Sequence, residues 1–193
     1  MIYLASQSPR RRELLETLGY RFRALAIDIP EHPAPGETPL DYVTRVAHEK
    51  AQAGLALVAG QADAVVLAAD TEVVLDGAVF GKPTDAADAI AMLQRLSGRT
   101  HEVSSVLWLV TAERADSAHC LSQVGFAELE RARIDEYVAS GEPFGRAGAY
   151  AIQGRGGALV AHLAGSHSAV MGLPLHETDR LLRRFGLRPV PGA

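Results

Sequence analysis

Residues 63–83 contain an acidic and a basic side chain that could act together as a catalytic site. Asp70 comes directly after residues 64–69, an unbroken apolar run that is typical of a strand buried on both faces. The dipeptide Asp76-Gly77 suits a tight hairpin turn, which would bring Lys82 back towards Asp70. A carboxylate at the end of a buried strand, faced by a lysine, could hold a metal ion or activate a water molecule. We therefore expect a site around Asp70.

A second group of polar residues lies where an expected strand, residues 1–5, is followed by an expected helix. Ser8 is a good N-cap, Pro9 suits the first helical position, and Arg10 and Arg11 follow. Free backbone N–H groups, the helix dipole and the guanidinium groups would together attract an anion. For any one arginine, an ordinary solvated side chain is the alternative. The clustering of these features at one junction favours an anion site.

Two more charged residues lie on neighbouring elements. Glu31 belongs to an expected loop, residues 28–37, which contains three prolines and a glycine. Thr38 is expected to cap the next helix, and Lys50 lies seven residues after Val43 on the apolar face of that helix. A lysine in this place either extends to water or reaches into a cleft. The sequence leaves both possibilities open.

The rest of the chain alternates between helical and extended patterns, with a glycine-rich loop at residues 142–157. We expect helices at 85–97, 134–140 and 174–185, strands at 22–27 and 158–163, a long antiparallel pair at 101–111 and 119–130, and a short extended piece at 169–173.

Composition limits the class of protein. The chain has 193 residues, of which 48% are hydrophobic, so we expect residues 1–193 to form a single domain, with two small lobes that share a cleft as the other possibility. The net charge of −4 argues against a nucleic acid polymer as partner. Cys120 is the only cysteine, which fits a reducing compartment, and no apolar run approaches the length of a membrane span. We expect a cytoplasmic protein without membrane contact.

Several common catalytic motifs are absent from the sequence. There is no Walker loop, dinucleotide fingerprint, paired-histidine zinc helix or nucleophile elbow. The acids and bases that remain would suit a polyphosphate held by fixed cations, with a hard metal such as magnesium between carboxylate and phosphate oxygens. Ordinary surface ion pairs are the alternative reading of the same residues.

Ordered motifs from about Ile2 to Leu182 resemble the Maf family of nucleoside triphosphate pyrophosphatases. They are Ser6-Gln7-Ser8-Pro9-Arg10-Arg11, Ala68-Ala69-Asp70-Thr71, Phe80-Gly81-Lys82-Pro83, Leu96-Ser97-Gly98 with His101, Glu142-Pro143, Ala147-Gly148-Ala149-Tyr150-Ala151-Ile152-Gln153-Gly154 and Gly172-Leu173-Pro174-Leu175. The resemblance implies an inosine-triphosphatase-like α/β fold, with an elongated mixed β-sheet flanked by helices and a cleft between two lobes, commonly in a homodimer. It also implies metal-dependent hydrolysis of a nucleoside triphosphate to the monophosphate and pyrophosphate.

The resemblance also implies roles for individual residues. The catalytic acid of the family corresponds to Asp70 and its loop acid to Glu31, and the two would hold a divalent cation, magnesium or manganese. Lys82 would serve catalysis by holding phosphate. The other phosphate-binding residues of the family correspond to Ser8, Arg11 and Lys50.

Substrate choice can be inferred from Arg10, Thr71 and Gln153, which resemble the branch of the family that acts on dTTP and UTP. A glutamine amide both donates and accepts, which suits the neutral edge of uracil or thymine, including that of modified pyrimidine nucleotides. The 7-methyl-GTP branch has an acid in its place. A 7-methyl-GTP or purine-selective enzyme and a nucleotide-sensing or septum-associated regulator are the alternatives. The chain departs from the family at Gly145-Arg146, where Asp-Lys is usual.

Overall fold

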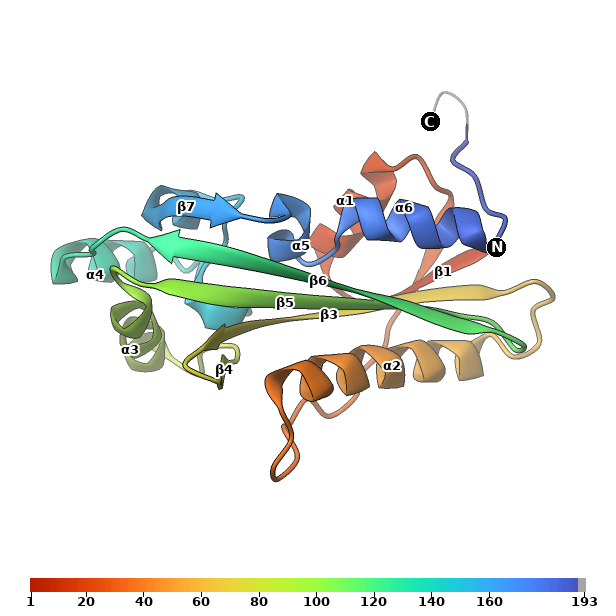
Figure 1. Ribbon diagram of the computed structural model, residues 1–193, viewed down its shortest axis with the longest axis horizontal. Coiled ribbons are helices and arrows are strands. Elements are labelled where there is room, and N and C mark those ends of the chain that lie inside the picture. Colours follow the sequence, from red (N-terminus) through yellow and green to blue (C-terminus); the bar gives the residue numbers. More distant parts are fainter. Residues whose placement is uncertain (191–193) are drawn as a thin grey trace.

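The computed structural model describes residues 1–190 and has an elongated mixed β-sheet of seven strands with helices on both faces (Figure 1). The strand order is β2-β1-β3-β5-β6-β7, and β4 pairs with β3 outside this path. The strands are β1 (Ile2–Ala5), β2 (Phe22–Leu25), β3 (Val65–Leu75), β4 (Ala78–Phe80), β5 (Thr100–Val110), β6 (Ala115–Phe126) and β7 (Val160–Ala164). The predicted α/β class, with an elongated mixed sheet flanked by helices, is confirmed.

Helices cover the two faces of the sheet in separate groups. They are α1 (Pro9–Thr17), α2 (Pro39–Leu57), α3 (Ala86–Leu96), α4 (Arg131–Ala139), α5 (His167–Met171) and α6 (Leu175–Arg184), with 3₁₀ turns at Ala147–Ala149 and Arg155–Leu159. Figure 1 shows α2 along one face and α1 with α6 along the other. Accordingly, Ala51 packs in one apolar cluster with Ala68, while Leu14 and Leu181 pack in another with Leu67. Among residues 1–190, no helix is both long and apolar enough to cross a membrane.

Strand β3 is longer than the sequence predicted. Instead of ending at Asp70-Thr71, it continues through Glu72 to Leu75 as one strand of 11 residues. The reason is its antiparallel pairing with β5, which runs without interruption from Val66 to Val74. The polar residues therefore lie in the middle of a strand, with their directions fixed by the alternation of side chains across the sheet.

The opposite edge of β3 is interrupted at these polar residues. Strand β1 pairs with Val65–Leu67, and β4 pairs with Val73–Leu75. Within the described part of the chain, residues 68–72 have no strand partner on this edge. The hairpin that returns β4 turns at Asp76-Gly77, as predicted, because both residues adopt positive φ angles of 53° and 74°. The gap between β1 and β4 leaves room for a cleft.

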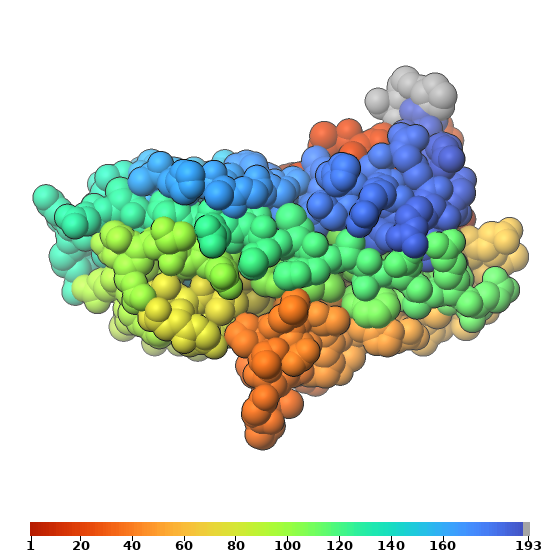
Figure 2. Space-filling view, viewed as in Figure 1, coloured from red at the N-terminus to blue at the C-terminus, as the bar shows by residue number. Residues whose placement is uncertain are grey.

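Side-chain caps begin the helices next to this gap. The Ser8 hydroxyl accepts a hydrogen bond from the Arg11 N–H, and Thr38 caps α2 in the same way. Both starts were predicted from the sequence. The expected extended piece at 169–173 is wrong, because Ser166 caps the short helix α5, which ends where Gly172 adopts a φ of 123°. The loop 28–37 precedes α2 and is largely exposed, projecting from the surface in Figure 2.

His101 is the most deeply buried titratable side chain at the other end of the sheet. It is 1% exposed, its Nε2 lies 2.9 Å from the hydroxyl of Tyr150, and its ring meets Phe126 edge to face. Burial lowers the pKa of His101 from 6.5 to about 4. The neutral imidazole is therefore the form that the folded protein accommodates.

His101 should make the folded protein sensitive to acid. Because the pKa is lower in the folded state, the unfolded chain takes up the proton first, and stability is lost as the pH falls from 6.5 towards 4. We expect a loss of about 2 kcal/mol in the free energy of unfolding by about pH 5. Urea denaturation of the wild type and of His101→Gln across this range provides the measurement. An equal pH dependence in the two proteins would contradict the prediction.

Candidate active site

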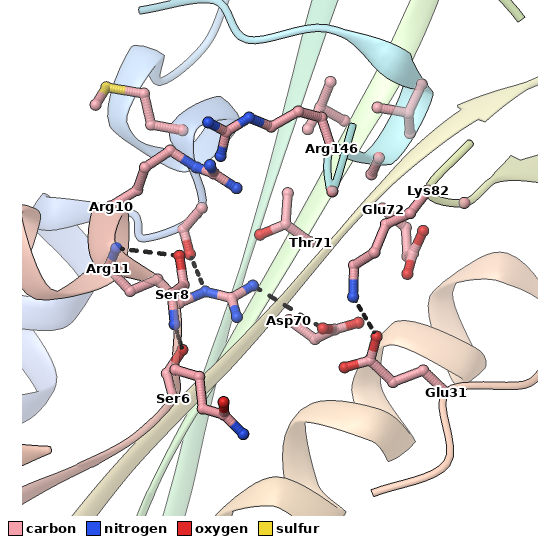
Figure 3. A pocket seen from close by; sticks show the side chains of 18 of the residues that line it. Ser6, Ser8, Arg10, Arg11, Glu31, Asp70, Thr71, Glu72, Lys82 and Arg146 are labelled. Carbon is pink, nitrogen blue, oxygen red and sulfur yellow. Dashed lines mark hydrogen bonds and ion pairs between the residues drawn. The ribbon is translucent and has the colours of Figure 1, made fainter. Parts of the chain in front are cut away.

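A cleft of about 840 Å³ opens at the interrupted edge of β3. All nine residues that the sequence analysis selected line this cleft: Ser8, Arg10, Arg11, Glu31, Lys50, Asp70, Thr71, Lys82 and Gln153. Figure 3 shows that the labelled members of this set come from separate segments of the chain and face one space: Ser8, Arg10, Arg11, Glu31, Asp70, Thr71 and Lys82. The structure therefore brings the whole predicted set together in one cleft.

Asp70 lies at the centre of the charged part of the cleft. Its side chain is buried, and its Oδ1 accepts a hydrogen bond of 2.7 Å from the Lys50 ammonium. The Arg11 guanidinium lies 3.9 Å from the same oxygen. Within residues 1–190, the buried Oδ2 of Asp70 has no hydrogen-bond partner. One oxygen of this carboxylate is thus held in place, while the other is available to a ligand.

Glu31 connects the loop before α2 to two lysines. Its Oε1 lies 2.6 Å from the Lys50 ammonium and its Oε2 lies 2.7 Å from that of Lys82. Partial burial alone would raise the pKa of Glu31, but the hydrogen bonds with the two lysines outweigh burial and lower the pKa to about 2. Lys50 is only 8% exposed, so its side chain reaches into the cleft rather than extending to water.

The start of α1 positions Arg11. Besides capping the helix, the Ser8 residue donates its N–H to the Ser6 hydroxyl at 3.2 Å. The Nε of Arg11 donates to the carbonyl of Gly172, at the end of α5, at 2.8 Å. This contact leaves the terminal nitrogens of the guanidinium directed towards Asp70 (Figure 3). A helix N-terminus, two hydroxyl groups and a fixed guanidinium therefore line one wall of the cleft.

Thr71 points to the opposite face of the sheet from Asp70, because successive side chains of a strand alternate. Its hydroxyl lies 2.8 Å from the hydroxyl of Ser105, which in turn donates to the carbonyl of Ala169 at 2.7 Å. Figure 3 shows Thr71, Arg10 and Arg146 on this side of the cleft. The Nε of Arg146 is buried without a hydrogen-bond partner among the described residues, and burial lowers the pKa of this side chain.

Glu72 is a residue of the cleft that the sequence analysis missed. It is 8% exposed, and its Oε2 has no hydrogen-bond partner within the described chain. Burial and then repulsion from Asp70 and Glu31 raise the pKa of Glu72 to about 8. The available signal was its spacing of two residues from Asp70, which places both on one face of a continuous strand. The predicted strand ends at Asp70-Thr71 and therefore does not include Glu72.

The loop that carries Gln153 is held by the carboxylate of Glu142. This carboxylate accepts hydrogen bonds from the backbone N–H groups of Arg155 and Gly156 and from the hydroxyl of Tyr137, at 2.8 to 3.0 Å. The Tyr137 hydroxyl also accepts from the N–H of Ala151 at 3.1 Å. The backbone is thus fixed on both sides of Gln153.

Gly154→Ala should disrupt this loop. A Cβ at position 154 would lie 2.7 Å from the Cδ of Glu142, so the carboxylate would have to leave the N–H groups of Arg155 and Gly156. We expect faster hydrogen exchange at these amides and a loss of about 1–3 kcal/mol in stability. Hydrogen exchange followed by mass spectrometry measures the effect. Gly60→Ala, where an added Cβ meets nothing within 4 Å, is the matched control and should change neither quantity.

The carboxylates of the cleft offer the ligands that a hard divalent cation prefers. Among the described residues, Asp70 and Glu72 each have one buried oxygen without a hydrogen-bond partner, and a divalent cation could take these oxygens as ligands. Among the described residues, no three histidine, cysteine or acidic side chains already form a metal-binding group. The carboxylate oxygens of Asp70 and Glu72 are of the kind that magnesium and manganese prefer. Further ligands would have to come from rearranged side chains, substrate or water.

The fold and the cleft define an α/β protein with a cleft of acidic and basic side chains that suits a polyphosphate. A sequence model described as "Maf-like protein" matches residues 1–185, and the chain belongs to this family.

Named relatives support the assignment. A dTTP/UTP pyrophosphatase of Xanthomonas axonopodis pv. citri (strain 306) is 57% identical over 188 residues, which cover 96% of this chain and 99% of the relative. A nucleoside triphosphate pyrophosphatase of Xylella fastidiosa (strain M23) is 54% identical over 186 residues, which cover 96% of this chain and 98% of the relative. Among solved structures, the Staphylococcus aureus Ham1 protein aligns with a TM-score of 0.44 at 14% identity, covering 66% of this chain and 72% of that chain.

Proposed function

We propose that this protein hydrolyses dTTP and UTP, and related modified pyrimidine nucleotides, to the nucleoside monophosphate and pyrophosphate. The observation that carries the proposal is the buried Asp70, which lies beside Lys50 and Arg11 in a cleft of acidic and basic side chains and has one oxygen without a hydrogen-bond partner among residues 1–190. The names of the relatives, whose sequences match over nearly their whole length, point to the same reaction.

Basic groups around the cleft would bind the triphosphate. Lys50 and Lys82 are held by Glu31 and Asp70 in the structure, and phosphate oxygens would compete for the same ammonium groups. Arg11, with the Ser8 hydroxyl and the N-terminal end of the α1 dipole, would bind on the other side. Positive charge on both walls would align the phosphate chain along the cleft.

Asp70 would act as the base of the reaction. Its Oδ2 would take a proton from a water molecule whose oxygen forms a bond to the α-phosphorus. The bond from the α-phosphorus to the bridging oxygen breaks, and the electron pair leaves with pyrophosphate. A magnesium or manganese ion held by Asp70 and Glu31 would supply charge to stabilise the phosphate oxygens. Lys82, whose ammonium contacts Glu31, would stabilise the same negative charge.

Arg10, Thr71 and Gln153 would select the base. Thr71 is fixed by the hydrogen bonds that join it through Ser105 to Ala169, so its hydroxyl and methyl groups have defined positions. Gln153 presents an amide from a loop whose backbone is fixed on both sides. A neutral donor and acceptor matches the edge of uracil or thymine, whereas a cationic 7-methylguanine would favour an acid.

A panel of nucleotides tests this selection. We expect the highest kcat/KM for dTTP and UTP, and a loss of roughly tenfold or more for dTTP in Gln153→Glu, since unpaired polar groups are costly. The variant should gain activity on 7-methyl-GTP. Gln61→Glu makes the same change at an exposed position that does not line the cleft and should leave the order of substrates unchanged. An unchanged order in Gln153→Glu would contradict the assignment.

We further propose that the protein is a single domain of two lobes around the cleft and acts as a homodimer in the cytoplasm. The family resemblance supports the dimer, and the single Cys120 fits a reducing compartment. Light scattering of the purified chain measures its mass in solution and so tests the dimer.

Tight nucleotide binding with negligible turnover would instead support the regulatory alternative.

A further inference from the structure

Glu72 is a second buried acid in the cleft, on the same face of β3 as Asp70. It lies two positions along the strand, and its side chain lines the same cavity. Figure 3 shows its carboxylate on the side of the cleft where Asp70, Glu31 and Lys82 gather. The residue is 8% exposed, and its Oε2 has no hydrogen-bond partner among residues 1–190.

An ordinary structural role does not account for this acid. A buried carboxylate without a partner costs free energy, and an apolar side chain such as those of Val73 and Val74 would fill the strand position without that cost. The described ion pairs of Lys50 and Lys82 go to Asp70 and Glu31, which leaves Glu72 without a direct ion pair. Such a group is tolerated where a ligand completes its coordination.

We propose that Glu72 is a third carboxylate ligand for the divalent cation that Asp70 and Glu31 would hold, an inference that rests on the proposed function. Asp70 and Glu31 are paired with Lys50 and Lys82, whereas Glu72 lies beside them without an ammonium partner among the described residues, so a bound cation could serve as its counter-ion. Their oxygens are the ligands that magnesium and manganese prefer.

A movement of Lys82 would complete the group. Within the described chain, no three acidic side chains already converge on one point, and the Lys82 ammonium contacts Glu31. The Lys82 side chain is 58% exposed, so it can leave Glu31 for a phosphate oxygen at small cost. Binding of the phosphate chain would thereby free Glu31 to share a cation with Asp70 and Glu72.

Manganese binding to the full chain tests the proposal and can be measured by electron paramagnetic resonance. The measurement uses a dTTP analogue with a methylene group between the α- and β-phosphates, which the protein cannot hydrolyse at that bond. Glu72→Gln should weaken manganese binding by roughly tenfold or more, since each lost carboxylate removes a charged ligand. Glu102→Gln changes an exposed acid of the neighbouring strand and should bind manganese as the wild type does. Thermal denaturation of each variant confirms that it folds.

The metal dependence of hydrolysis separates this inference from the proposed function. Glu72→Gln should need a higher manganese concentration for half-maximal dTTP hydrolysis and recover most of its kcat when metal is saturating. Glu72→Asp should need a manganese concentration between those of Glu72→Gln and the wild type for half-maximal hydrolysis. Equal manganese affinity in Glu72→Gln and the wild type would overturn the role of Glu72 while leaving the dTTP activity of the wild type intact. Failure of the wild type to hydrolyse dTTP would instead overturn the function.

Discussion

Asp70→Asn is expected to lower kcat for dTTP by about 10²–10⁴-fold, the range typical of a lost general base. Asparagine has nearly the same shape, and its amide oxygen can still accept the hydrogen bond from Lys50. It cannot take a proton from water, however, and it removes the negative charge that would attract a cation. The fold should therefore survive the change while the reaction is lost.

Steady-state kinetics and thermal denaturation of Asp70→Asn together test this expectation. Asp63→Asn provides the matched control, because Asp63 is exposed and does not line the cleft. The control should retain both activity and stability. A folded Asp70→Asn protein with nearly full activity would show that another group accepts the proton.

Lys50→Met should reduce both catalysis and stability. The Lys50 ammonium contacts Asp70 at 2.7 Å and Glu31 at 2.6 Å, so its removal leaves two carboxylates without their shared partner. Breaking a buried ion pair costs about 3–5 kcal/mol, and we expect the lower end because Arg11 and Lys82 remain nearby. Loss of a phosphate-binding cation should also lower kcat/KM by about 10²-fold or more.

Urea denaturation and kinetics measure the two effects of Lys50→Met. Arg45→Met removes another cation of α2, which is 34% exposed and pairs with Glu37 and Glu49, and should cost less stability than Lys50→Met. Lys50→Arg should keep most of the stability but not the full activity, because a guanidinium cannot replace the compact ammonium. Equal stability of Lys50→Met and the wild type would contradict the proposed electrostatic role.

Local signals in the sequence predicted much of the framework around the cleft. Ser8 and Thr38 begin helices through side-chain caps, and Asp76-Gly77 adopts the positive φ angles of a hairpin turn. Each signal depends on a few consecutive residues, which is why it can be read without a structure. The family motifs then selected nine residues, and all of them line one cleft.

Features that depend on distant parts of the chain could not be predicted in this way. The continuation of β3 through Glu72 follows from its pairing with β5, roughly thirty residues away along the chain. The direction of Lys50 is set by Asp70 and Glu31, which belong to other elements. Glu142 likewise became visible as an anchor of the Gln153 loop only once Tyr137 and Gly156 were placed around it.

Identification of the products of dTTP hydrolysis tests directly whether the protein releases the nucleoside monophosphate and pyrophosphate. The full chain would be incubated with magnesium and dTTP labelled at the α-phosphate, and the products separated by ion-exchange chromatography. We expect labelled dTMP and unlabelled pyrophosphate in equal amounts, because attack occurs at the α-phosphorus. Release of labelled dTDP with single phosphate, or no product from folded protein, would contradict it.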